Sequence, residues 1–152
     1  MNNTSKPLTI SLVQTDNVWE NIQENLDRLS AKITSISKDT DVIILPELFS
    51  TGFTMEAENV AETMDGKGVT WMQNTAKEKN CLVIGSLLIS ESKQYFNRLI
   101  VAFPDERLLH YDKRHLFSFA GEDKVFKAGT EKTNDAYHNV VIFHQEKQQL
   151  TY

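Results

Sequence analysis

The strongest constraint on the fold is a helix pattern that lies between two short apolar segments. Residues 8–14 (LTISLVQ) and 41–45 (DVIIL) are apolar runs, which are typical of buried strands. Between them, apolar residues recur at steps of three and four, as on an amphipathic helix: Val18, Ile22, Leu26, Leu29, Ile33 and Ile36. Asn17, with Glu20 three positions later, predicts the start of this helix. The order strand, helix, strand predicts a βαβ unit with a parallel pair.

The rest of the chain predicts a single α/β domain with a mixed sheet. We expect a second helix at 70–79, with Met72 and Ala76 on its buried face. Further apolar strands are expected at 81–89, 95–103, 108–111 and, near the end of the chain, 140–143. The short turn before residue 108 favours antiparallel neighbours, so the sheet should contain both parallel and antiparallel pairs.

Composition excludes several classes of function. The net charge of −5 over 152 residues provides no attraction to nucleic acid or to an anionic membrane. The four histidines show no metal-ligand spacing, and no apolar run is long enough to cross a membrane. The first residues lack the apolar centre of a signal peptide, and the single cysteine, Cys81, cannot form an intrachain disulfide. We therefore expect a cytoplasmic protein that binds neither nucleic acid nor membranes.

Two charged residues follow predicted strands, where α/β folds place their ligands. Glu47 comes directly after the strand at 41–45, and a half-buried carboxylate there has a raised proton affinity that suits a general base. Lys113 follows the strand at 108–111, where an ammonium held in a pocket would stabilise an oxyanion. Taken singly, each residue fits an ordinary surface position better, and the same holds for Glu122.

Taken together, these segments are far more specific. The motifs PELF at 46–49 and DKRHLF at 112–117, with Glu122 just beyond, resemble the nitrilase superfamily of carbon–nitrogen hydrolases. The segments STGF at 50–53 and IGS at 84–86 are also similar to that family. The form YDKRHLF, together with GFTM at 52–55, resembles its ω-amidase branch. The resemblance extends over about residues 8–132, which is most of the chain.

The resemblance implies a fold, a reaction and roles for three residues. Family members are α-β-β-α sandwiches with mixed sheets, and they usually form homodimers or higher homo-oligomers. Their catalysis uses a Glu-Lys-Cys set, needs no cofactor or metal, and in the ω-amidase branch acts on small ω-amides of dicarboxylates such as 2-oxoglutaramate. By motif position, Glu47 would be the general base, Lys113 would stabilise the oxyanion, and Glu122 would be the additional glutamate that positions lysine and substrate.

The chain departs from the family at the nucleophile. The family cysteine lies downstream of the lysine, in a segment similar to CYDLRFP, and no cysteine follows Lys113. We expect Cys81, which opens an apolar strand, to be a buried structural thiol, so no residue is assigned as nucleophile. Residues 1–132 would then be the N-terminal part of a carbon–nitrogen hydrolase domain whose C-terminal portion is missing, and 133–152 a divergent tail.

Three interpretations of this departure remain open at the level of sequence. The chain is a truncated amidohydrolase that is inactive alone, a non-catalytic binding or interaction module, or an unrelated α/β ligand-binding domain. Removing strands from a sandwich leaves an apolar face exposed, and the tail residues Gln145–Gln149 are too few to cover it. That argument favours the truncated amidohydrolase over the module.

Overall fold

A five-stranded mixed sheet forms the centre of the molecule. The computed structural model describes residues 7–131, and its strands lie side by side in the order β1-β2-β3-β4-β5. Their bounds are Ile10–Leu12 (β1), Val42–Ile44 (β2), Leu82–Glu91 (β3), Gln94–Ala102 (β4) and Leu108–Asp112 (β5). β1, β2 and β3 are parallel neighbours, whereas β4 is antiparallel to both β3 and β5. The predicted βαβ unit and mixed sheet are therefore confirmed.

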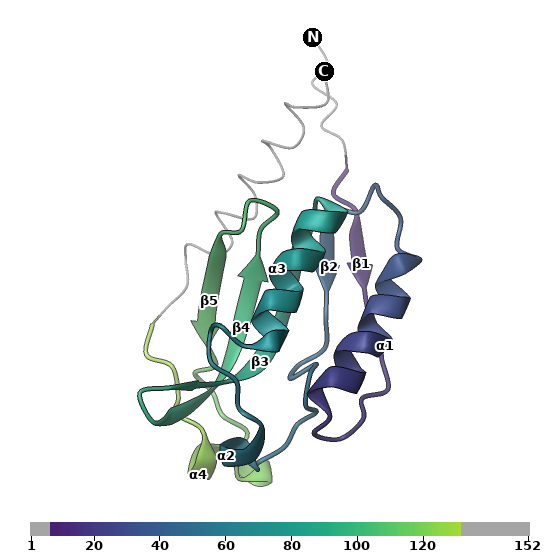
Figure 1. Cartoon of the computed structure of the whole chain (residues 1–152). Coiled ribbons are helices and arrows are strands. Elements are labelled where there is room, and N and C mark those ends of the chain that lie inside the picture. Colours follow the sequence, from purple (N-terminus) through teal and green to yellow (C-terminus); the bar gives the residue numbers. More distant parts are fainter. Residues whose placement is uncertain (1–6, 132–152) are drawn as a thin grey trace.

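Two long helices cover one face of the sheet. α1 (Ile22–Thr34) and α3 (Lys67–Lys79) lie in front of the strands in Figure 1. The predicted buried pair on α3, Met72 and Ala76, is fully buried there. With Leu29 of α1 and Ile43 of β2 they belong to the main apolar core, because the helix stripes and the alternate strand side chains meet between the two layers.

The start of α1 differs from the prediction. Asn21 is the N-cap, and its side chain accepts a hydrogen bond from the Glu24 N–H at 3.2 Å. Asn17 lies four positions earlier, because Glu20 adopts a left-handed backbone (φ 56°) and its N–H donates to the Thr51 carbonyl at 2.8 Å. That contact with a distant loop keeps the preceding residues out of the helix, so a local capping pattern gave the wrong cap.

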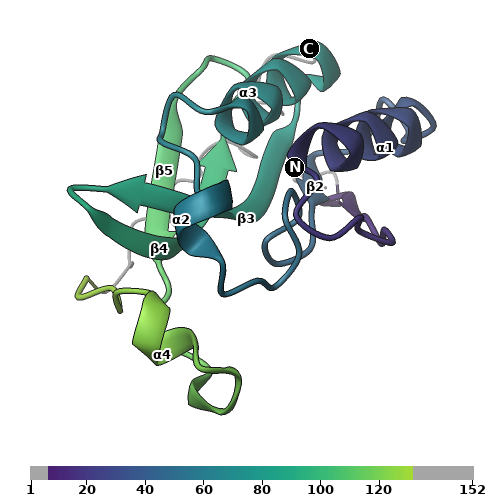
Figure 2. The same ribbon diagram turned by 60° about the horizontal axis from the view of Figure 1, so that its bottom comes forward.

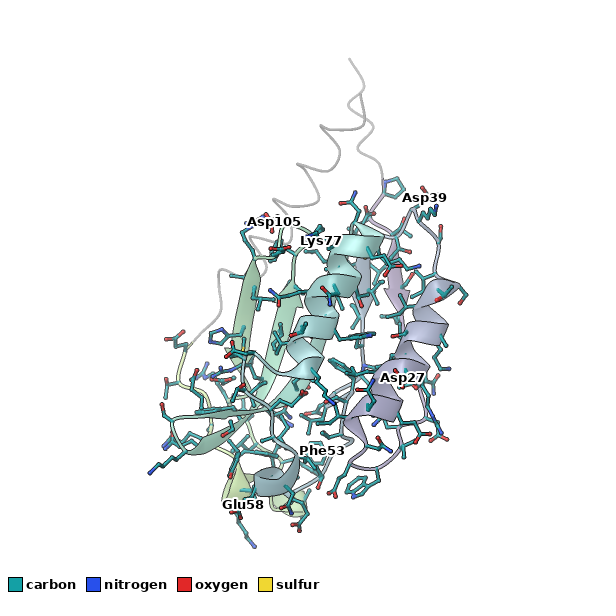
Figure 3. The ribbon with its side chains drawn as sticks, viewed as in Figure 1. Asp27, Asp39, Phe53, Glu58, Lys77 and Asp105 are labelled. Atoms are coloured by element: carbon teal, nitrogen blue, oxygen red, sulfur yellow. The ribbon has the colours of Figure 1, made fainter. Side chains whose placement is uncertain are left out.

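Three short helical turns gather at the end of the sheet where β2 and β5 finish. They are α2 (Ala57–Val60), η1 (Ser118–Ala120) and α4 (Glu122–Val125). Figure 1 shows α2 and α4 at the bottom of the molecule, and Figure 2, which brings this end forward, shows α2 in front of the strands. In Figure 3, Phe53 and Glu58 lie at this end, and Lys77 and Asp105 lie at the opposite one.

The second face of the sheet is apolar and partly exposed. Side chains of Leu12 (78 % exposed), Ile10 (49 %) and Leu99 (36 %) lie on it, beside buried Val42 and Val101. No helix covers this face within residues 7–131. The sheet and its two helices therefore correspond to one α-β half of the expected sandwich. The predicted strand at 140–143 lies outside the described residues.

Candidate active site

A turn that is held by hydrogen bonds to β3 places Glu47 at the end of β2. Leu48 has a left-handed backbone (φ 47°), which is costly for a branched side chain, and it is fully buried. Its N–H donates to Ser86 Oγ at 2.9 Å, and the Phe49 N–H donates to the Ser86 carbonyl at 3.3 Å. The turn is therefore held against β3, while the Glu47 side chain remains half exposed.

Lys113 lies at the end of β5, with its backbone held from two sides. Its N–H donates to the Asn97 carbonyl of β4 at 2.9 Å, and its own carbonyl accepts from the Gly129 N–H at 3.0 Å. The ammonium Nζ lies 2.8 Å from Glu47 Oε1, 3.0 Å from Glu122 Oε2 and 5.2 Å from the centre of the Phe53 ring. A cation at that distance from an aromatic face is attracted to it.

Glu122 begins α4 and is fully buried. Its Oε2 accepts a hydrogen bond from the Phe117 N–H at 2.6 Å, and its Oε1 accepts one from Asn97 Nδ2 at 3.0 Å. Burial opposes ionisation of this carboxylate, but these donors and Lys113 outweigh that cost, so the pKa of Glu122 lies below its ordinary value of 4.5.

The charge of Lys113 is maintained by the same contacts. Burial disfavours its ammonium, but the hydrogen bonds and attraction to Glu47 and Glu122 prevail, so the pKa of Lys113 lies above its ordinary value of 10.5. At neutral pH the site therefore holds a fixed cation between two carboxylates, of which Glu122 is fully enclosed and Glu47 faces solvent.

The structure brings all three residues singled out in the sequence into one group. It also adds Asn97, whose Nδ2 donates to Glu47 Oε1 at 2.7 Å as well as to Glu122. Sequence reasoning missed Asn97, although a signal was present: Asn97 and Arg98 interrupt an otherwise apolar strand between Phe96 and Leu99. A polar residue buried in a strand needs a partner, and here the partners are the two carboxylates.

A cleft of about 300 Å³ opens beside this group. Its lining includes Glu47, Asn97 and Lys113, and the other lining residues are Leu45, Pro46, Ser86, Leu99 and Tyr111. A small ligand in the cleft would contact a carboxylate able to take a proton and an ammonium able to stabilise a developing negative charge. Acyl transfer from an amide uses these two elements together with a nucleophile.

Cys81 lies away from the site. It is fully buried and directly precedes β3. Because β2 and β3 are parallel, the start of β3 and the end of β2 that carries Glu47 lie at opposite ends of the strands. Among residues 7–131, no group of three or more His, Cys, Asp or Glu side chains is arranged to hold a metal ion. Within the same residues, no helix has the length and apolar character needed to cross a membrane.

Comparison with known proteins decides the family. The sequence profile described as "Carbon-nitrogen hydrolase" matches residues 9–148. The chain belongs to the carbon–nitrogen hydrolase family. The resemblance to the nitrilase superfamily that the motifs indicated is thereby confirmed, and with it the expected fold class.

Relatives within the carbon–nitrogen hydrolase family include two curated bacterial amidases. An omega-amidase YafV from Yersinia enterocolitica is 36 % identical over 125 residues, covering 82 % of this chain and 48 % of that protein. A 2-oxoglutaramate amidase from Bacillus subtilis (strain 168) is 30 % identical over 126 residues, covering 81 % of this chain and 49 % of that protein. The chain thus spans about half the length of the curated relatives it matches.

A solved structure of the carbon–nitrogen hydrolase superfamily shares the fold. XC1258 from Xanthomonas campestris, a protein with an arsenic adduct in its active site, is 40 % identical with a TM-score of 0.79. The match covers 82 % of this chain and 47 % of that one. The mixed sheet with helices on one face is therefore the arrangement that this superfamily uses over the matched half.

Proposed function

We propose that this chain carries the acid–base and oxyanion-stabilising part of an ω-amidase site. Glu47 is the general base, Lys113 stabilises the tetrahedral oxyanion, and Glu122 positions the lysine. One observation carries the proposal: Lys113 Nζ contacts both carboxylates, at 2.8 and 3.0 Å, at the wall of a cleft large enough for a small molecule.

The reaction divides the hydrolysis of an amide into two easier steps. Glu47 takes the proton of a cysteine thiol, the thiolate attacks the amide carbon, and the negative charge on the carbonyl oxygen forms next to the Lys113 ammonium. Glu47 returns the proton to the leaving ammonia, and a thioester remains. Glu47 then deprotonates a water molecule that attacks the thioester and releases the acid and the thiol.

The substrates that we propose are small ω-amides of dicarboxylates. Two relatives named as an ω-amidase and a 2-oxoglutaramate amidase, at 36 % and 30 % identity, support this class. The small volume of the cleft, about 300 Å³, also favours a substrate of this size. We assign the reaction to the cytoplasm and to a homo-oligomer, without cofactor, nucleic acid or membrane.

We further propose that the 152-residue chain is inactive alone. Its single cysteine, Cys81, is buried at the edge of the sheet opposite Glu47, so Glu47 cannot take its proton. The purified chain should release no ammonia from 2-oxoglutaramate above background, and mass spectrometry after a substrate quench should find no acyl adduct on the Cys81 peptide. Ammonia release that Glu47→Gln abolishes would overturn this part of the proposal.

The site roles are tested in a chimera. Residues 9–131 replace the matched part of the Yersinia enterocolitica ω-amidase, whose remaining half supplies the downstream segment. The chimera should release ammonia from 2-oxoglutaramate, and Glu47→Gln and Lys113→Met should each reduce kcat/KM at least about 100-fold, the loss typical of a removed base or oxyanion donor. Glu78→Gln, an exposed change on α3, is the matched control and should leave kcat/KM unchanged. A folded chimera that hydrolyses the amide equally well in all variants rules out the assigned roles.

The second candidate is a non-catalytic binding or interaction module, favoured by the absence of a cysteine after Lys113. The exposed apolar side chains of Ile10, Leu12 and Leu99 count against it, because a module that functions alone would carry polar residues on that face. Analytical ultracentrifugation over a range of protein concentrations separates the two. A chain that remains monomeric favours the module, and a chain that self-associates favours the truncated amidohydrolase.

A further inference from the structure

Asn97 makes contacts that neither the motifs nor the proposed roles require. It is 3 % exposed and lies on β4, next to Lys113 of the neighbouring strand end. Its single amide nitrogen donates to two different carboxylates, to Glu47 Oε1 at 2.7 Å and to Glu122 Oε1 at 3.0 Å. An amide NH₂ has two N–H groups, so each carboxylate receives one of them.

These two hydrogen bonds divide the carboxylates into an enclosed one and an open one. Both oxygens of Glu122 are occupied, Oε1 by Asn97 and Oε2 by Lys113 and the Phe117 N–H. In Glu47, Asn97 and Lys113 both contact Oε1, and within the described part of the chain no hydrogen bond reaches Oε2. The open oxygen therefore belongs to the half-exposed residue that lines the cleft.

We propose that Asn97 is a positioning residue that fixes Glu122 on Lys113 and leaves Glu47 Oε2 as the oxygen that exchanges a proton in the cleft. The inference rests on the proposed function for the meaning of that proton exchange. Its geometric content, that one amide holds both carboxylates on the lysine, can be tested without any substrate.

No other residue type of similar size can make this arrangement. An aspartate at position 97 has the same shape but no N–H, and it would bring a third negative charge next to Glu47 and Glu122. An alanine would leave the enclosed Glu122 with one donor fewer, at a site that water does not reach. Both changes make the ionised form of Glu122 less favourable, and the aspartate does so more strongly because it adds repulsion to the lost hydrogen bond.

The test is a titration of the full 152-residue chain, labelled with ¹³C at the glutamate carboxyl groups and followed by NMR. In the unsubstituted chain the midpoint of the Glu122 signal should lie below pH 4.5. Burial raises the pKa of Glu122, but its hydrogen bonds and the charge of Lys113 lower it by more. The midpoint should move upward in Asn97→Ala and further upward in Asn97→Asp. Asn74→Asp adds the same charge on the exposed face of α3 and should leave the midpoint unchanged.

Each outcome supports or overturns the inference. A Glu122 midpoint that stays with the control in both variants overturns it, and so does a shift in Asn97→Asp alone, which would be a charge effect without a positioning role. Dispersed amide signals establish that each variant is folded. If Asn97→Ala does not fold, Asn97→Leu takes its place, because leucine has a similar size to asparagine but neither an N–H donor nor a charge. If the chimera is inactive while the Asn97 variants shift Glu122, the proposed function fails and the positioning role stands.

Discussion

Lys113 Nζ and Glu47 Oε1 lie 2.8 Å apart although the two residues are separated by 66 positions in the chain. The contact exists because β2 and β5 end at the same edge of the sheet, with β3 and β4 between them. Glu122 completes the group from the fully buried side. The ends of β2 and β5 and the start of α4 thus place one cation against two carboxylates, and several measurable consequences follow from the burial of that group.

Replacing Lys113 should lower the free energy of unfolding more than replacing Lys77, whose ion pair with Glu106 is shorter but exposed to solvent. Lys113→Met leaves the enclosed Glu122 carboxylate without its cation, and we expect a loss of about 2–3 kcal/mol in the free energy of unfolding, because an uncompensated buried charge is costly. Urea denaturation at neutral pH measures the loss.

The matched control is Lys77→Met. Lys77 Nζ lies only 2.6 Å from Glu106 Oε1, but both side chains are more than half exposed, so this pair should contribute very little. If the two variants lose the same stability, the burial of Glu122 does not strengthen its pair with Lys113.

Stability should depend on acid through Glu122. Its folded pKa lies below 4.5, since its hydrogen bonds outweigh burial, so its contribution is complete above about 4.5 and is lost as the pH falls through the folded value. We expect the urea concentration at the unfolding midpoint to decrease when the pH is lowered below 4.5. This decrease should be less steep in Glu122→Gln. Lys113 affects stability at alkaline pH. Burial lowers its pKa, but the two carboxylates outweigh burial and raise the pKa above 10.5. Its contribution to stability is therefore lost only as the pH rises through that raised value.

The exposed residue Glu78 provides the reference for this titration. Glu78→Gln should keep the acid dependence of the unsubstituted chain. An equally steep decrease below pH 4.5 in Glu122→Gln would show that Glu122 is not held ionised by its donors.

The sequence predicted the layers of this fold better than the details of its site. Predominantly apolar segments of strand length identified all five described strands. The polar pair Asn97-Arg98 in β4 marks a buried polar position, but the partners of Asn97 and of Ser86 lie in segments that are distant in the sequence, so no local pattern reveals their roles. The left-handed backbone of Leu48, which turns Glu47 toward the cleft, was equally hidden, since leucine has no preference for that conformation.

The failed prediction at Asn17 has its own test. Asn17 Oδ1 is buried and, within the described residues, has no hydrogen-bond partner, whereas Asn21 caps α1. Asn25 makes more hydrogen bonds than either of them. Its Oδ1 accepts from the Val18 N–H at 2.7 Å, and its Nδ2 donates to the carbonyls of Val18 and Ser50 at 2.7 and 2.8 Å. We expect Asn21→Ala to cost about 1 kcal/mol and Asn25→Ala about 2–3 kcal/mol. An Asn17→Ala variant that loses more than Asn21→Ala would restore the original assignment of the cap.

The strand end that carries Lys113 should depend on a buried arginine. Arg98 is 1 % exposed, and its Nε and Nη2 contact Asp112 at 2.6 and 2.9 Å, while Glu91 approaches from the exposed side at 3.1 Å. Asp112→Asn should cost about 2–3 kcal/mol, because it removes the enclosed partner of a buried cation. Glu91→Gln should cost no more than about 1 kcal/mol, since Glu91 is half exposed. Equal losses would show that both carboxylates, and not Asp112 alone, hold the end of β5.

The packing of the Glu47 turn against β3 should tolerate no side chain at Gly85. A Cβ added there would lie 2.9 Å from both Leu45 Cβ and Phe49 Cδ1, on either side of the turn. Gly85→Ala should therefore cost about 2–3 kcal/mol by overpacking and should shift the NMR signals of Leu45 and Phe49. Gly121→Ala is the contrasting change, because no atom lies within 4 Å of its added Cβ and only its left-handed backbone (φ 78°) is strained, at about 1 kcal/mol. Gly121→Ala should leave the Leu45 and Phe49 signals in place. If Gly85→Ala leaves them in place as well, the close approach of the turn to β3 is not what orients Glu47.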